Sequence, residues 1–154
     1  IFTGLDWELP EMVRRRVIMT EGYNQGRFRA FQSSSDAVLR LIARLHREGI
    51  TILPGTDNFL AGFTLLRELV YYTEAGIPNN EVLQIATIVP ARHMGLDHRL
   101  GSIEVGKDAQ MFLVDGDPVT DIRALYHVAQ VFKGRHLYYA PDLLRAEGVS
   151  PRRK

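Results

Sequence analysis

The stretch Thr51-Ile52-Leu53-Pro54-Gly55-Thr56-Asp57-Asn58 is the starting point for predicting the fold of this chain. Three apolar or β-branched residues run into a Pro-Gly break, and a carboxylate follows at once. This pattern predicts a short buried strand that ends in a loop presenting Asp57. Helical patterns lie on both sides, and a strand between two helices is typical of a parallel sheet. In barrels of this kind the C-terminal strand ends hold the chemistry, so Asp57 is a candidate functional residue.

The same carboxylate also has a purely structural interpretation. Asp is favoured as an N-cap and in turns, because its side chain accepts hydrogen bonds from exposed backbone N–H groups. From these eight residues alone the turn interpretation leads, and both interpretations stay open.

Composition narrows the class of protein. The chain has 154 residues, 45% of them hydrophobic, and a formal net charge of +1, which is typical of one soluble globular domain. No apolar run approaches the roughly 20 residues of a membrane span, and no basic stripe indicates nucleic acid. The absence of cysteine excludes disulfides and thiolate metal ligands, but the compartment stays unknown.

Helical patterns dominate the first two thirds of the chain. The cluster Ser33-Ser34-Ser35-Asp36 is a typical N-cap sequence and predicts a helix start, and Gly49 is expected to end that helix as its C′ residue. His46 lies in its last turn, where a histidine is more often a charge that suits the helix dipole than a ligand. Further helices are predicted over residues 10–29, 63–75, 78–86 and 91–94.

Two helical faces are expected to be buried. They are formed by Val38, Leu41, Ile42 and Leu45 in the helix before Gly49, and by Leu65, Leu66, Leu69 and Val70 in the helix over 63–75. Glu68 is expected on the solvated side of that second helix.

From about Leu96 the period changes to short β-like runs between turns, with strands predicted over residues 110–114, 128–132 and 136–139. The chain is therefore divided into residues 1–95 and residues 96–154. Asp115 and Asp117 look like a paired carboxylate, but their neighbours Gly116 and Pro118 favour a turn.

A series of motifs resembles the C-terminal portion of the amidohydrolase superfamily, in the branch of imidazolonepropionase-like and prolidase-like enzymes. The resemblance covers roughly residues 35–139, and the order and spacing of its motifs agree throughout. The matching stretches are residues 52–57, 66–69, 74–78, 86–92, 95–97, 100–109, 115–118 and 131–134.

The resemblance implies an α/β fold. Residues 1–95 would be the last βα units of a (β/α)8 TIM-like barrel, with Asp57 on the last strand. Residues 96–154 would be part of a small β-sandwich (composite) domain and the C-terminal tail. It also implies a hydrolase of C–N bonds in amides, cyclic amides or dipeptides. Asp57 would be its metal ligand and catalytic residue, and would take a proton from a metal-bound water. The site would hold one or two divalent metal ions, with zinc as the expected metal.

The family's His-x-His pair is not in this chain. The five histidines, at positions 46, 93, 98, 127 and 136, are not spaced as ligands from one strand. Because a catalytic zinc takes about three protein ligands, the resemblance implies that the chain alone does not hold the metal tightly. We expect a C-terminal piece of a longer polypeptide, completed by the rest of that polypeptide or by a companion chain.

A second class of function stays open, which is a catalytically silent interaction or scaffold module that retains the amidohydrolase fold. Expected partners are a small-molecule amide or dipeptide substrate, with no nucleic acid and no membrane. The sequence leaves the substrate undetermined, and whether the protein forms a homo-oligomer is also open.

Overall fold

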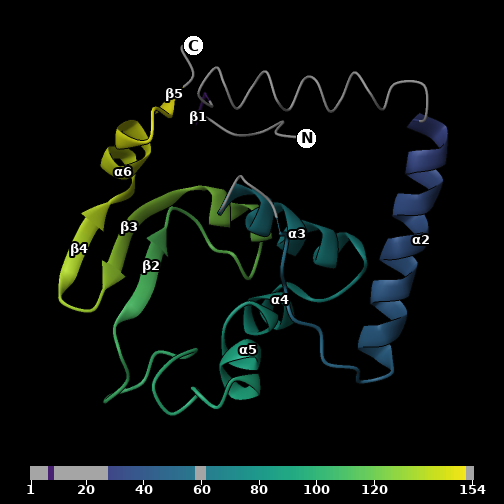
Figure 1. The fold of residues 1–154 in the computed structure, drawn as a ribbon, viewed down its shortest axis with the longest axis horizontal. Helices are drawn as coiled ribbons and strands as arrows, with labels where there is room; N and C mark the ends of the chain where they lie inside the picture. Colours follow the sequence, from purple (N-terminus) through teal and green to yellow (C-terminus); the bar gives the residue numbers. More distant parts are fainter. Residues whose placement is uncertain (1–6, 9–27, 58–61, 152–154) are drawn as a thin grey trace.

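The computed structural model describes residues 7–8, 28–57 and 62–151 (Figure 1). The helix predicted over residues 10–29 lies almost wholly outside these ranges. In chain order the elements are β1 (Trp7–Glu8), α2 (Phe28–Arg47), α3 (Phe63–Glu74), α4 (Asn79–Ile85), α5 (Ile88–His93), β2 (Gln110–Val114), the 3-10 helix η2 (Ile122–Tyr126), β3 (Val128–Lys133), β4 (His136–Tyr139), α6 (Ala140–Ala146) and β5 (Ser150–Pro151).

One apolar core joins the helical part of the chain to the β-rich part. Leu69 and Val70 on α3 are buried, as the helical spacing predicts. They share a cluster with Val82 on α4 and with Ile122 and Leu125 on η2. The division of the chain near Leu96 stays a prediction, and residues from both sides of it build this core.

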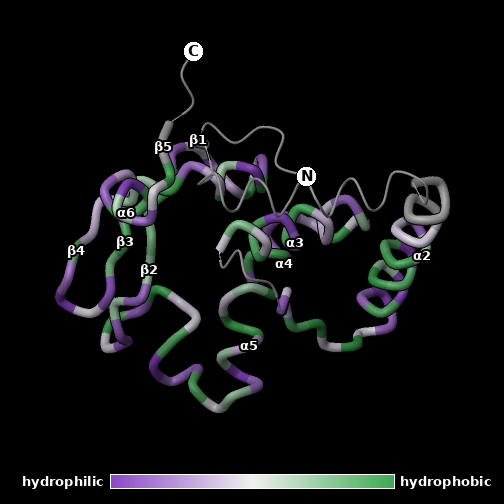
Figure 2. Tube along the Cα trace, turned by 45° about the horizontal axis from the view of Figure 1, so that its top comes forward, coloured by the Kyte–Doolittle hydropathy of each residue, from purple (hydrophilic) through white to green (hydrophobic). Residues whose placement is uncertain are grey.

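Helix α2 is amphipathic, with hydrophobic and hydrophilic bands along its length (Figure 2). Its C-terminal end is as predicted, because Gly49 has a left-handed φ of 71° and its amide donates to the His46 carbonyl oxygen at 3.0 Å. Its predicted start is wrong. The helix begins at Phe28 and runs through the serine cluster, since serine inside a helix is only a few tenths of a kcal/mol worse than average residues.

The predicted apolar face of α2 is only partly covered. Ile42 and Leu45 are half-buried, and Ile42 packs against the core cluster. Val38 and Leu41 are each 53% exposed. The prediction of a fully buried face is therefore wrong for these two residues in this structure.

The small sheet is antiparallel, in the order β2-β3-β4. Its three strands agree with the predicted ranges to within a residue. Val131 is paired with Phe112 on one side and with Tyr138 on the other. Helix α6 packs against β3 and β4. A separate antiparallel pair joins β1 to β5 and brings segments from the two ends of the chain together.

Residues 51–57 do not form the predicted buried strand, since no described residue pairs with their backbone as in a sheet. They do keep the period-2 burial of a strand. Ile52, Pro54 and Thr56 are half-buried, whereas the residues between them are exposed. The burial pattern is that of a half-buried strand, but the described part of the chain contains no strand that pairs with it.

None of the helices within the described ranges combines the length and the apolar character that crossing a membrane requires.

Two glycines beside α5 test how closely the chain packs there. Gly95 and Gly101 both have left-handed φ, but only at Gly101 would a Cβ clash, at 2.7 Å from the Ala91 Cβ and 2.8 Å from the Ile88 Cα. We expect Gly95→Ala to lower the free energy of unfolding by about 1–2 kcal/mol, the strain of a left-handed residue. Gly101→Ala should lower it by roughly 1–3 kcal/mol more, because of overpacking. Chemical denaturation of both variants measures the difference, and equal losses would contradict the close packing.

Candidate functional site

Asp57 ends the strand-like segment and is exposed. Its φ of 42° is left-handed, a conformation that Asp tolerates better than most residues. The helix that follows has Gly62 as its N-cap, so Asp57 is not the N-cap of α3. No hydrogen bond or ion pair joins its carboxylate to another residue of the described ranges. No described residue therefore occupies the positions around this carboxylate where a ligand would bind.

Helix α3 holds the segment that carries Asp57. The Gly55 amide donates to both carboxylate oxygens of Glu68, at 3.1 and 3.2 Å. One residue further on, the Thr56 and Thr64 hydroxyl oxygens lie 3.1 Å apart in a hydrogen bond. The prediction that Glu68 is merely solvated is wrong, because this carboxylate is half-buried and bonded to the backbone two residues before Asp57.

Tyr72 supports Glu68 from the next helical turn. Its hydroxyl donates to the Glu68 Oε1 at 2.5 Å, and the Tyr72 side chain is only 4% exposed. Burial, together with the hydrogen bond to the Glu68 carboxylate, raises the pKa of the Tyr72 phenol well above its ordinary value. The phenol therefore remains a hydrogen-bond donor through the neutral range.

Thr64, Glu68 and Tyr72 form one polar stripe along α3, which we call the α3 stripe. Their spacing of four residues places them on the same face of the helix. The same spacing is present in the sequence, but the apolar residues of this helix form a stronger periodic pattern, which dominates the prediction of its faces. For this reason the stripe is not predictable from the sequence pattern alone.

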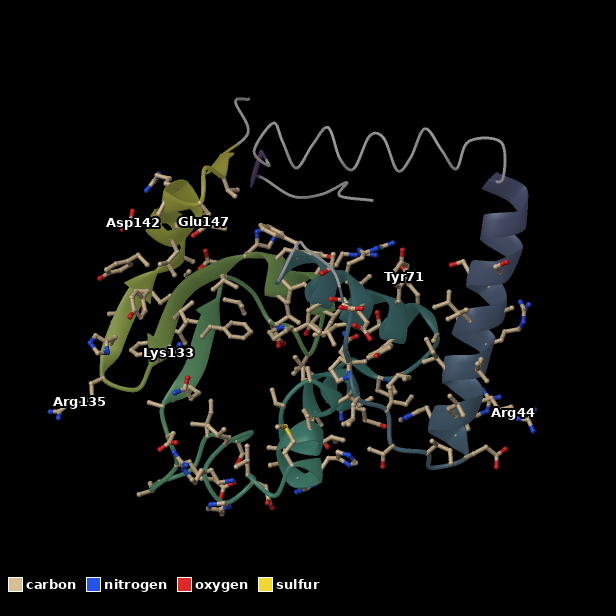
Figure 3. All side chains as sticks on the ribbon, viewed as in Figure 1. Arg44, Tyr71, Lys133, Arg135, Asp142 and Glu147 are labelled. Atoms are coloured by element: carbon tan, nitrogen blue, oxygen red, sulfur yellow. The ribbon has the colours of Figure 1, made fainter. Side chains whose placement is uncertain are left out.

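An open groove runs between α2 and α3, with a volume of about 460 Å³. Glu68 and Tyr72 line it from α3, and Val38 and Ile42 line it from α2. Tyr71 also lines the groove from α3 (Figure 3). The Arg67 guanidinium carbon lies over the Tyr71 ring, 4.3 Å from its centroid. The walls of the groove are mostly apolar side chains.

His46 and His136 contact other side chains of the described residues. The His46 Nε2 lies 3.0 Å from a Glu81 carboxylate oxygen, which links the end of α2 to the first turn of α4. This contact involves no metal ligand among the described residues, and the interpretation of His46 as a helix-end charge stays a prediction. His93 and His98 are exposed, and the His136 ring stacks with Tyr138 at 6.3 Å between centroids.

The described residues do not make a metal site by themselves. Nowhere in those ranges do three or more His, Cys, Asp or Glu side chains gather in an arrangement suited to a metal ion. Asp57 fits the role of one oxygen ligand, because its carboxylate is exposed and has no partner within the same ranges. A catalytic zinc takes about three protein ligands.

Asp117 is a turn residue, as its neighbours predict. Its carboxylate accepts hydrogen bonds from the Thr120 hydroxyl at 2.7 Å and from the Val119 amide at 2.9 Å. These bonds lower the pKa of the Asp117 carboxyl. Asp115 is exposed nearby, and its amide donates to the His127 carbonyl oxygen.

The sequence profile of the Amidohydrolase family matches residues 29–137, a range that includes Asp57 and the α3 stripe. This match extends over well more than half of the chain. The chain therefore belongs to the Amidohydrolase family, in agreement with the resemblance of its motifs.

Individual relatives place the chain near prolidases and imidazolonepropionases. It is 29% identical over 108 residues to the imidazolonepropionase of Thermoplasma acidophilum, which is 64% of this chain and 26% of that protein. The crystal structure of a Xaa-Pro dipeptidase with bound methionine matches at a TM-score of 0.62 and 34% identity, covering 67% of this chain and 26% of that one. The crystal structure of a putative prolidase from Bifidobacterium longum matches at a TM-score of 0.60 and 32% identity, and the match covers 73% of this chain and 27% of that one. The chain thus spans about a quarter of the length of these relatives.

Tyr72 allows a test of the α3 stripe by pH. Because the folded state raises the pKa of the phenol, the stability that the phenol contributes is present below pH about 10 and is lost as the pH rises above that value. We expect the free energy of unfolding to fall more steeply above pH 10 in the parent than in Tyr72→Phe, as measured by urea titrations at several pH values. Tyr139→Phe is the control, because Tyr139 is 55% exposed, and it should keep the parental slope. Equal slopes for the parent and Tyr72→Phe would contradict the contact.

Proposed function

We propose that this chain is part of a hydrolase that cleaves C–N bonds in a small amide, cyclic amide or dipeptide. The observation that carries the proposal is the family match over residues 29–137, because it includes the segment that presents the exposed Asp57 carboxylate. Similarity to an imidazolonepropionase and to a Xaa-Pro dipeptidase supports the substrate class.

Residues 51–57 would be the last strand of a (β/α)8 barrel. Their alternating burial supports this role, since it is the pattern of a strand with one covered face. The sheet β2-β3-β4 would be part of the small β-sandwich that follows the barrel. Residues 1–95 and 96–154 would then be the barrel portion and the sandwich portion of the chain.

Asp57 would be the catalytic carboxylate. A carboxylate beside the scissile bond accepts the proton of the attacking water and passes it to the leaving nitrogen. A divalent metal, zinc for preference and present as one or two ions, would activate the water and polarise the carbonyl. Since the described residues do not form a metal site, the other ligands would come from the rest of the polypeptide or from a companion chain.

Replacing Asp57 by Asn tests this role in the intact protein. Asn tolerates a left-handed φ as Asp does, so the backbone is kept while the proton acceptor is lost. We expect kcat/KM to fall by roughly 10²–10⁴-fold, the usual contribution of a general base. The assay is hydrolysis of a Xaa-Pro dipeptide and of imidazolonepropionate, with metal content measured on the same samples.

Asp115→Asn is the matched control, because Asp115 is also an exposed Asp and lies in the β-rich part of the chain. This variant should keep parental activity. Parental activity in Asp57→Asn would remove Asp57 from the mechanism. A parent protein that binds no divalent metal and hydrolyses neither substrate would favour the silent scaffold module.

A further inference from the structure

The backbone before Asp57 has an unusual hydrogen-bond partner. A strand's N–H groups normally donate to the carbonyl oxygens of a neighbouring strand. At Gly55 the acceptor is the Glu68 side chain, 13 residues further along the chain. Both carboxylate oxygens lie within 3.2 Å of the same amide nitrogen, so the carboxylate is centred on that N–H group.

The Glu68 carboxylate is itself fixed in place. The Tyr72 hydroxyl donates to one of its oxygens, and Tyr72 is anchored among the buried residues of the core cluster. A continuous chain of contacts therefore runs from the core through Tyr72 and Glu68 to Gly55. The Thr56–Thr64 hydrogen bond adds a second link between the same two elements.

Asp57 follows these two links directly. Its left-handed φ of 42° is a conformation that costs energy for most residues, and such conformations persist where the surroundings determine them. Glu68 and Thr64 hold the two residues immediately before it. Contacts to α3 thus hold the two residues that lead into Asp57, whereas no described residue contacts the Asp57 carboxylate itself.

We propose that Glu68 is a positioning residue for Asp57, acting through the Gly55 amide, and that Tyr72 keeps the Glu68 carboxylate in place. Glu68 does not touch the reacting atoms in this assignment. The inference rests on the proposed function, because it takes Asp57 as the catalytic carboxylate.

The first test is amide hydrogen exchange at Gly55, which does not depend on catalysis. It compares the intact parent protein with Glu68→Ala, Glu68→Gln and Glu74→Ala, using mass spectrometry of peptides that cover residues 53–57. Glu74 is the matched control, a carboxylate on the same helix that pairs with Arg67 at 3.5 Å. We expect at least tenfold faster exchange in Glu68→Ala. Glu68→Gln should be intermediate, because its amide oxygen still accepts one hydrogen bond, and Glu74→Ala should stay within twofold of the parent.

The second test is the split between kcat and KM in the same variants. Misplacing a reacting group by about 1 Å lowers the rate by up to about 10²-fold. Glu68→Ala is therefore expected to lower kcat at least tenfold, with KM changed less than threefold and metal content unchanged. Glu68→Gln should recover a large part of kcat, whereas a loss of fold would lower both activity and soluble yield.

The outcomes separate the two proposals. Parental kcat in Glu68→Ala, together with an inactive Asp57→Asn, overturns the positioning role alone. Parental exchange at Gly55 in Glu68→Ala overturns it as well. Parental activity in Asp57→Asn overturns the proposed function, and the exchange data still decide whether Glu68 holds this segment.

Discussion

The hydrogen bonds from the Gly55 amide to the Glu68 carboxylate join the segment that presents Asp57 to the helix that builds the core. Helix α3 has two faces with different tasks. Its apolar face carries Leu69 and Val70 into the core shared with η2. Its polar stripe holds the backbone beside Asp57. Packing of the core and placement of the candidate catalytic carboxylate therefore depend on the same helix.

Several apolar surfaces of the described chain lie open. Val38 and Leu41 on α2 are exposed, and so are Leu137 and Tyr139 on β4. Residues 51–57 have strand-like burial without a neighbouring strand. Contiguous exposed apolar surface is typical of an interface. These features support the proposal that further strands and helices, from the same polypeptide or from a companion chain, complete the barrel and its metal ligands.

Most elements were predictable from local pattern, and the errors have identifiable causes. The strands of the small sheet follow from alternating apolar residues between turns, and the end of α2 follows from Gly49. The start of α2 was predicted wrongly at the serine cluster, because an N-cap sequence does not prevent a helix from starting earlier. Glu68 was predicted to be solvated because residue type indicates solvation on average, whereas its contact with the Gly55 amide depends on how the segment before Asp57 packs against α3.

Local sequence was sufficient for the family, for the helices and the three-stranded sheet between residues 63 and 139, and for Asp57 as the candidate catalytic residue, because these depend on spacing and residue type within short windows. Only the tertiary structure decided what surrounds Asp57. The Gly55–Glu68 contact joins the segment before Asp57 to α3, and the His46–Glu81 pair joins α2 to α4. Such contacts form only when packing brings the elements together, and no local pattern specifies which polar side chain then meets which backbone group.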